Sequence, residues 1–63
     1  MFKTIRFEWK NGAWIEQLDF GAGDPVPPIG TFVSLKSAAY RCVVVGVEFD
    51  YHDHMIIVQV AYA

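Results

Sequence analysis

The sequence contains a single cysteine, few charged residues and no long apolar run. One cysteine cannot form a disulfide within the chain, so the fold depends on noncovalent packing. The apolar runs are far shorter than a membrane-spanning helix needs. Apolar residues at helical spacing are also absent, which argues against helices as main elements. The seven acidic residues outnumber the five basic ones, which argues against a nucleic-acid partner held through phosphate contacts.

Apolar and aromatic side chains are abundant. Of the 63 residues, 54% are hydrophobic and 16% are aromatic, which excludes an intrinsically disordered chain. This length suits one domain, residues 1–63, without internal repeats. No apolar stretch of the signal-peptide kind follows the basic residues of Met1–Arg6. We therefore expect a cytoplasmic protein, and because no cofactor motif is present, we expect no cofactor.

The N-terminal third has the pattern of a β-hairpin. Asn11-Gly12 favours a two-residue type I′ turn, which needs a positive φ at both central residues. A turn centred there predicts a register with four pairs: Trp9 with Trp14, Phe7 with Glu16, Ile5 with Leu18, and Lys3 with Phe20. Directly opposed residues share a face, so this register gathers these apolar side chains on one side. The other face then carries Thr4, Arg6, Glu8, Ile15, Gln17 and Asp19.

The middle of the chain is predicted to be a loop. Gly21–Gly30 is rich in glycine and proline, which disfavour a central strand. Val26 and Ile29 are expected to fold back over one end of the core. A short strand is then predicted over Thr31–Lys36, followed by a turn at 36–39.

The C-terminal third has the pattern of a longer hairpin. Its strands are predicted over Tyr40–Asp50 and Met55–Tyr62, with the turn in Tyr51–His54. This hairpin has an apolar inner face, built by four predicted pairs: Phe49 with Ile56, Val47 with Val58, Val45 with Val60, and Val43 with Tyr62.

The other face of this second hairpin is unusually apolar. A solvated face should be mostly polar, yet only Glu48 and Gln59 are polar on it. Contiguous apolar surface marks an interaction site, so we expect an oligomer interface here. Its residues would be Cys42, Val44, Gly46, Met55, Ile57, Gln59 and Ala61. Replacing Ile57 by lysine should then dissociate the assembly.

Five short strands in so small a chain favour a strongly bent barrel. Closure removes the exposed sheet edges that invite aggregation. We therefore predict an all-β fold, a small five-stranded antiparallel barrel of the SH3-like kind. An open β-meander that is completed by dimerisation is the alternative.

The second half of the chain resembles a known family. Gly30-Thr31-Phe32-Val33, Lys36-Ser37-Ala38-Ala39-Tyr40 and Val45-Gly46 look like the core of type II dihydrofolate reductases, which are plasmid- and integron-borne. Val58-Gln59-Val60 looks like the pore-lining Val-Gln-Ile of that family. The resemblance implies an SH3-like barrel, a tetramer around a central pore and a gene on a mobile element. It also implies a ligand site lined by Lys36, Tyr40 and Gln59.

Other candidate chemistry is sparse. Asp50, His52, Asp53 and His54 have metal-ligand side chains, but a solvated turn explains them as well, and we predict no metal site. His52 and His54 could instead make assembly depend on pH. Glu16 is expected at the barrel rim, paired with Lys3 or another cation. No catalytic residue can be assigned.

These observations favour a non-enzymatic binding or adaptor module. It would self-associate through the last hairpin as a dimer or tetramer, and it could also take a protein partner. Nucleic acid and membrane are not expected as partners. The alternative is an oligomeric ligand-binding protein or reductase-like enzyme with its pocket between subunits, because a monomer this small has little room for one.

Overall fold

The fold consists of five β-strands in a computed structural model, which describes residues 2–19, 21 and 25–63. The strands are β1 (Thr4–Trp9), β2 (Trp14–Asp19), β3 (Phe32–Val33), β4 (Cys42–Asp50) and β5 (Met55–Tyr62). No helix occurs within these described ranges. The predicted all-β class and the five strands are therefore confirmed.

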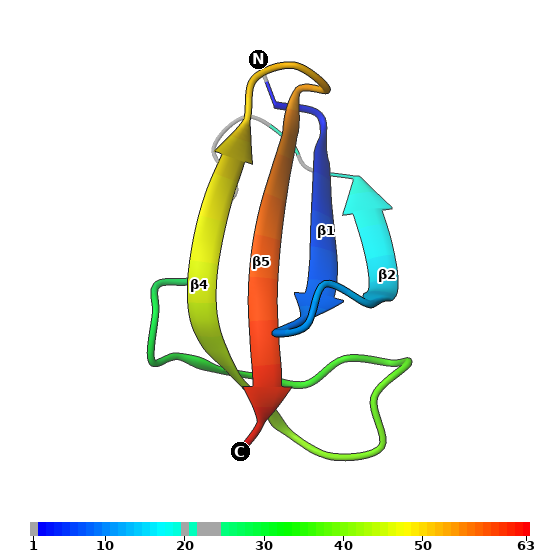
Figure 1. Cartoon of the computed structure of the whole chain (residues 1–63), viewed down its shortest axis with the longest axis vertical. Coiled ribbons are helices and arrows are strands. Elements are labelled where there is room, and N and C mark those ends of the chain that lie inside the picture. Colours follow the sequence, from blue (N-terminus) through cyan, green and yellow to red (C-terminus); the bar gives the residue numbers. More distant parts are fainter. Residues whose placement is uncertain (1, 20, 22–24) are drawn as a thin grey trace.

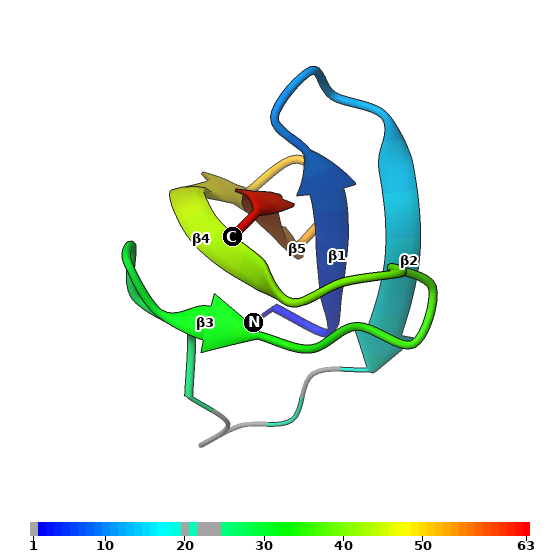
Figure 2. The ribbon, with the colours of Figure 1, turned by 90° about the horizontal axis from the view of Figure 1, so that it is seen from below.

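The strands form one curled sheet in the order β2-β1-β5-β4-β3 (Figure 1). Three neighbouring pairs are antiparallel, as predicted, but β1 and β5 run parallel. Successive strands alternate in direction along the chain, so the first and the fifth point the same way. These two strands are neighbours in the sheet and therefore pair in parallel. The sheet is therefore mixed, and it curls into a half-barrel (Figure 2).

The open side of the half-barrel lies between β2 and β3, which share no ladder. The segment between β3 and β4 crosses this side toward β2 (Figure 2). One hydrogen bond ties it there: the backbone N–H of Ser37 donates to Oε1 of Glu16 at 3.1 Å. Among the described residues Glu16 has no ion pair with Lys3 or another cation, so the expected pairing is wrong; its carboxylate binds a backbone amide.

The first hairpin keeps most of its predicted register. Phe7 lies opposite Glu16, and Ile5 lies opposite Leu18, as predicted. The turn itself differs. Gly12 has a positive φ of 93°, but Asn11 does not, so the type I′ turn is wrong. The N–H of Gly12 donates to the carbonyl of Trp9 at 2.8 Å. The N–H of Trp9 donates to the carbonyl of Ala13 at 2.8 Å, so the loop between this bonded pair contains three residues, Lys10–Gly12.

The observed loop is one residue longer than the predicted two-residue turn, and a β-bulge in the hairpin accommodates this difference. Trp14 lies opposite Glu8 instead of Trp9, and the register shifts between Phe7 and Glu8. The extra residue on β2 is Ile15, which is buried in the core rather than on the polar face. Trp14 is exposed. Phe20 and its predicted pairing with Lys3 lie outside the described residues.

The second hairpin also keeps its predicted register up to a β-bulge. Phe49 pairs with Ile56 and Val47 with Val58, as predicted. The ladder then shifts between Val44 and Gly46, which makes Val45 a bulge residue. Beyond it Val44 faces Val60, and Cys42 faces Tyr62. The predicted pairs of Val45 with Val60 and Val43 with Tyr62 are therefore wrong.

The core lies on the inner face of the curled sheet, where β5 contributes most of the fully buried side chains. Burying an aliphatic side chain of this kind contributes roughly 1.5–3 kcal/mol. The core residues are Ile5, Phe7, Ile15, Cys42, Val44, Ile56, Val58 and Val60.

The middle of the chain closes one end of this core. Val26 packs against it, as predicted, but Ile29 is exposed. The strand predicted over Thr31–Lys36 is shortened to β3, and the predicted turn near Ser37 is present, with the N–H of Ala38 bonded to the carbonyl of Leu35 at 3.1 Å. Residues 22–24 of the predicted loop lie outside the described residues.

Candidate functional site

Two residues of the predicted interface lie in the core. Cys42 is 0% exposed and Val44 is 1% exposed, so neither is on an outer face. The reason is the bulge at Val45. The extra residue reverses the inward and outward alternation of β4 on one side of it, because side chains in a strand alternate with a period of two. Val43 and Val45 therefore take the outward places.

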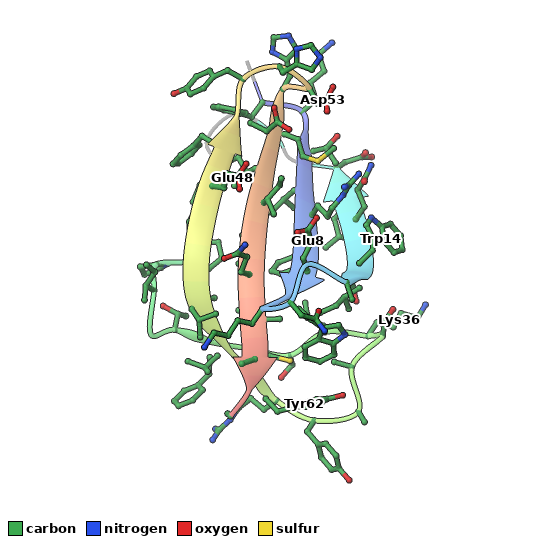
Figure 3. The ribbon with its side chains drawn as sticks, in the orientation of Figure 1. Glu8, Trp14, Lys36, Glu48, Asp53 and Tyr62 are labelled. Atoms are coloured by element: carbon green, nitrogen blue, oxygen red, sulfur yellow. The ribbon has the colours of Figure 1, made fainter. Side chains whose placement is uncertain are left out.

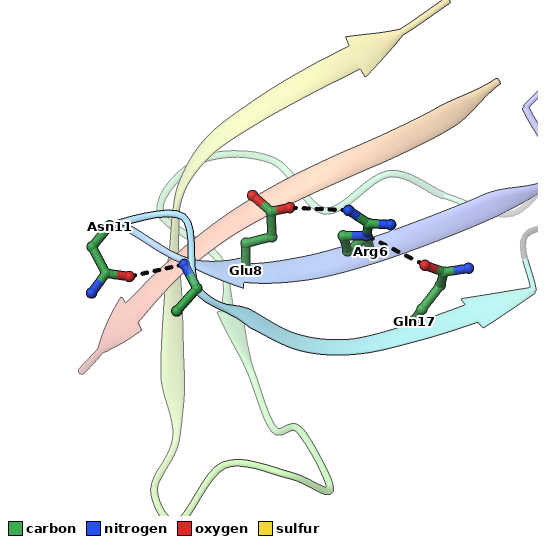
Figure 4. Close-up of polar contacts among 5 residues, drawn as sticks. Arg6, Glu8, Asn11 and Gln17 are labelled. Atoms are coloured by element: carbon green, nitrogen blue, oxygen red, sulfur yellow. Dashed lines mark hydrogen bonds and ion pairs between the residues drawn. The ribbon is translucent and has the colours of Figure 1, made fainter. Parts of the chain in front are cut away.

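Polar side chains cover much of the remaining outer face. Ile57 is only 9% exposed, and its cross-strand neighbours are Arg6 on β1 and Glu48 on β4. Arg6 Nη1 lies 3.6 Å from Glu8 Oε2, and its Nε donates to Gln17 Oε1 at 3.3 Å (Figure 4). Glu8 and Glu48 both lie on the face toward the viewer in Figure 3. The centre of this face is therefore not a continuous apolar patch.

Four of the predicted interface residues, Gly46, Met55, Gln59 and Ala61, are partly exposed. Gln59 lies across the ladder from Gly46. Its Oε1 is 2.7 Å from the point that a Cβ on residue 46 would occupy. The missing side chain of Gly46 thus makes room for the carboxamide of Gln59. Whether these residues form an interface remains a prediction.

The three residues of the implied ligand site come from two elements. Gln59 lies on β5, whereas Lys36 and Tyr40 lie in the segment between β3 and β4. Tyr40 is exposed and packs edge-on against Tyr62, with ring centroids 5.6 Å apart. No pocket is found in the described part of one chain.

The tip of the second hairpin is organised by Asp50. Its Oδ1 accepts hydrogen bonds from the backbone N–H groups of His52 at 3.0 Å and Asp53 at 3.1 Å. His54 has a φ of 53°, the left-handed conformation that ends the turn. Asp50 thus serves the turn, and among the described residues no three His, Cys, Asp or Glu side chains are arranged to hold a metal ion.

A free sheet edge runs along half of β4. β3 pairs only with Val43 and Cys42, and Gly30 and Thr31 bond both backbone groups of Val44. Beyond this point Gly46–Asp50 pairs with β5 alone within the described part of the chain, and the bulge residue Val45 has no ladder partner there. The upper half of β4 forms one side of the sheet in Figure 1.

The direction of the backbone groups on this edge follows from β5. The carbonyls of His54 and Val60 accept hydrogen bonds from Lys3 and Lys10 at the β1 side. By alternation Ile56 and Val58 also direct their backbone groups toward β1. Their partners on β4, Phe49 and Val47, therefore direct their N–H and C=O groups away from β5, toward the free edge.

Apolar side chains accompany this edge. Val45 is 38% exposed and Phe49 is 47% exposed. The ring of Phe49 packs against Phe2 with centroids 5.4 Å apart, and Phe2 in turn contacts Tyr51 at 5.2 Å. Val45–Asp50 contains neither lysine nor proline, the residues that commonly protect an exposed edge. We call Val45–Asp50 the β4 edge.

Sequence reasoning missed the β4 edge because it assumed a longer partner strand. The predicted strand Thr31–Lys36 would have covered more of β4 than the two residues of β3 do. The glycines and prolines before Thr31 could have signalled that the chain reaches β4 only briefly.

No family model, no curated protein and no solved structure matches this chain. No helix in the described residues is long and apolar enough to cross a membrane.

Proposed function

We propose that this chain is a self-associating β-module whose C-terminal hairpin, β4–β5, is the interaction element, through the β4 edge. The observation that carries the proposal is the pair of outward-directed backbone groups at Val47 and Phe49. Unpaired N–H and C=O groups on a strand are a template for another strand. A binding or adaptor role follows from such an edge, and it needs no catalytic residue.

The edge pairs with a second copy and joins two half-barrels into one continuous sheet. Five or six paired residues bury less area than a standard stable interface, so we expect micromolar affinity. The exposed side chains of Val45 and Phe49 add apolar contact beside the backbone bonds. We also propose that the half-barrel is of the SH3-like kind. Its strands follow one another around the barrel in chain order, and this arrangement supports the assignment.

The mass in solution tests this function. Light scattering over a micromolar to millimolar series should show the mass rising from 7.1 kDa toward twice that value. Val47→Pro removes the outward N–H without touching the ladder to β5, and edge strands tolerate proline. We expect Val47→Pro to remain monomeric and Val47→Thr, the control that keeps the N–H, to assemble. A wild-type monomer throughout would contradict the proposal.

A second variant separates the two surfaces of the hairpin. If the outer face around Ile57 is the interface, Ile57→Lys dissociates the assembly and Val47→Pro leaves it intact. If the β4 edge is the interface, the pattern is reversed. Far-ultraviolet circular dichroism of both variants establishes that the monomer remains folded.

The alternative function rests on the family resemblance together with the position of Gln59. Gln59 overlies Gly46 on the β4 edge, so two copies of Gln59 would approach each other in a dimer paired there. A ligand at that axis would also use Lys36 and Tyr40, as the resemblance implies. Saturable binding of a nucleotide or a pterin, abolished by Gln59→Ala, would support this alternative; absence of binding by the assembled protein would reject it.

A further inference from the structure

We propose that the two copies pair antiparallel with Val47 on the two-fold axis, so that Glu48 of each copy lies opposite Gly46 of the other. This inference rests on the proposed function, since it specifies how the β4 edge pairs with itself. Only residues with outward-directed backbone groups can form the hydrogen-bonded pairs of a new ladder. Val47 and Phe49 are those residues, so only three two-fold registers are possible.

Charge decides among the three registers. An axis at Glu48 would set this carboxylate opposite its own copy, and an axis at Phe49 would set Glu48 opposite Asp50. Like charges directly opposite each other destabilise a pair of strands. An axis at Val47 sets Glu48 opposite Gly46, which has no side chain, and therefore avoids both conflicts.

In the proposed register Glu48 of the second copy lies opposite Gly46, beside Gln59. Glu48 and Gly46 are two apart on one side of the bulge, so they share the outer face, and directly opposed residues of paired strands also share a face. The carboxamide oxygen of Gln59 lies over Gly46, 2.7 Å from the point that a Cβ there would occupy. A carboxylate only accepts hydrogen bonds, so Gln59 would turn its carboxamide to bring the amide nitrogen, a donor, toward Glu48 of the second copy.

The inner face of the same register is apolar. Val47 would meet its own copy at the axis. Phe49 shares this inner face and is 47% exposed in the single chain, so a second copy beside it buries surface that is otherwise wet. The contact of Phe49 with Phe2 holds its ring beside the edge.

Single cysteines along β4 test the register under a mild oxidant. Cys42 is fully buried, so the parent chain is the control and should not cross-link. In the proposed register Val47→Cys places the two thiols directly opposite each other, with Cα atoms about 5.5 Å apart, and a disulfide can span that distance. Glu48→Cys offsets the thiols along the strands and should cross-link far less.

The outcomes separate the register from the proposed function. Efficient cross-linking of Val47→Cys with little for Glu48→Cys supports the register, whereas the reverse order overturns it in favour of an axis at Glu48. A dimer by mass in which neither variant cross-links overturns the register and leaves self-association standing. A monomer at every concentration overturns both.

A second measurement does not need a substitution. In a dimer mixed from isotope-labelled and unlabelled chains, intermolecular nuclear Overhauser effects should join the methyl groups of Val47 in one chain to those of Val47 in the other. Effects that join the two Phe49 rings instead would overturn the register.

Discussion

At the scale of the residue, Cys42 is a titratable group placed among the valines and isoleucines of the core. Its Sγ lies 3.5 Å from the carbonyl of Tyr40 and has no exposure to solvent. Burial raises the pKa of this thiol above its ordinary value of 9.0, because the thiolate would lose its hydration. Cys42 is therefore a packing residue, and it should react with thiol reagents only when the chain opens.

The raised pKa of Cys42 makes stability depend on alkaline pH. Below the ordinary pKa both states hold the proton, so pH has no effect through this group. As the pH rises above 9.0, the unfolded chain releases the proton while the folded chain keeps it, and the folded state loses stability. We expect the free energy of unfolding of the wild type to fall relative to Cys42→Ala over this range. Parallel pH profiles of the two proteins in urea titrations would contradict this.

At the scale of the element, each of the two hairpins contains a β-bulge, in which one strand has one residue more than its partner. Alternation of apolar residues predicts Phe7 opposite Glu16 and Phe49 opposite Ile56, and both pairs are present. The bulge residues Ile15 and Val45 could not be predicted. A bulge leaves the alternation of apolar residues intact on each side of it and changes only which residues face inward beyond it. The burial of Cys42 and Val44 follows from that shift. The shortness of β3, which leaves the β4 edge without a partner strand among the described residues, depends on tertiary contacts.

The first hairpin depends on the conformation of one glycine in its turn. Gly12 has a φ of 93°, which costs a residue with a Cβ about 1–2 kcal/mol. Asn11 supports the same turn, because its Oδ1 accepts a hydrogen bond from the N–H of Ala13 at 3.0 Å (Figure 4). We expect Gly12→Ala to lower the free energy of unfolding by about 1–2 kcal/mol in urea titrations. The exposed neighbour Lys10, replaced by alanine, should change it by less than about 0.5 kcal/mol; equal effects would show that the turn conformation is not the cause.

At the scale of the whole molecule, the half-barrel leaves β-strand edges unpaired that a closed barrel would not have. The five strands and much of the core could be predicted from the sequence. Closure of the barrel was also assumed, but it depends on how closely β2 and β3 approach each other. A chain this small has a modest core and is marginally stable by itself. Pairing two β4 edges adds buried surface and stabilises the folded state by mass action.

The most direct test of self-association through the β4 edge is amide hydrogen exchange, measured residue by residue across a range of protein concentrations. The amides of Val47 and Phe49 have no partner in the described part of the chain, so they should exchange quickly in dilute solution and slow down as the dimer forms. The amide of Glu48 is the internal control, since it faces β5 and should be protected throughout. If the mass rises with concentration while Val47 and Phe49 continue to exchange quickly, the chain associates through another surface and the account is wrong.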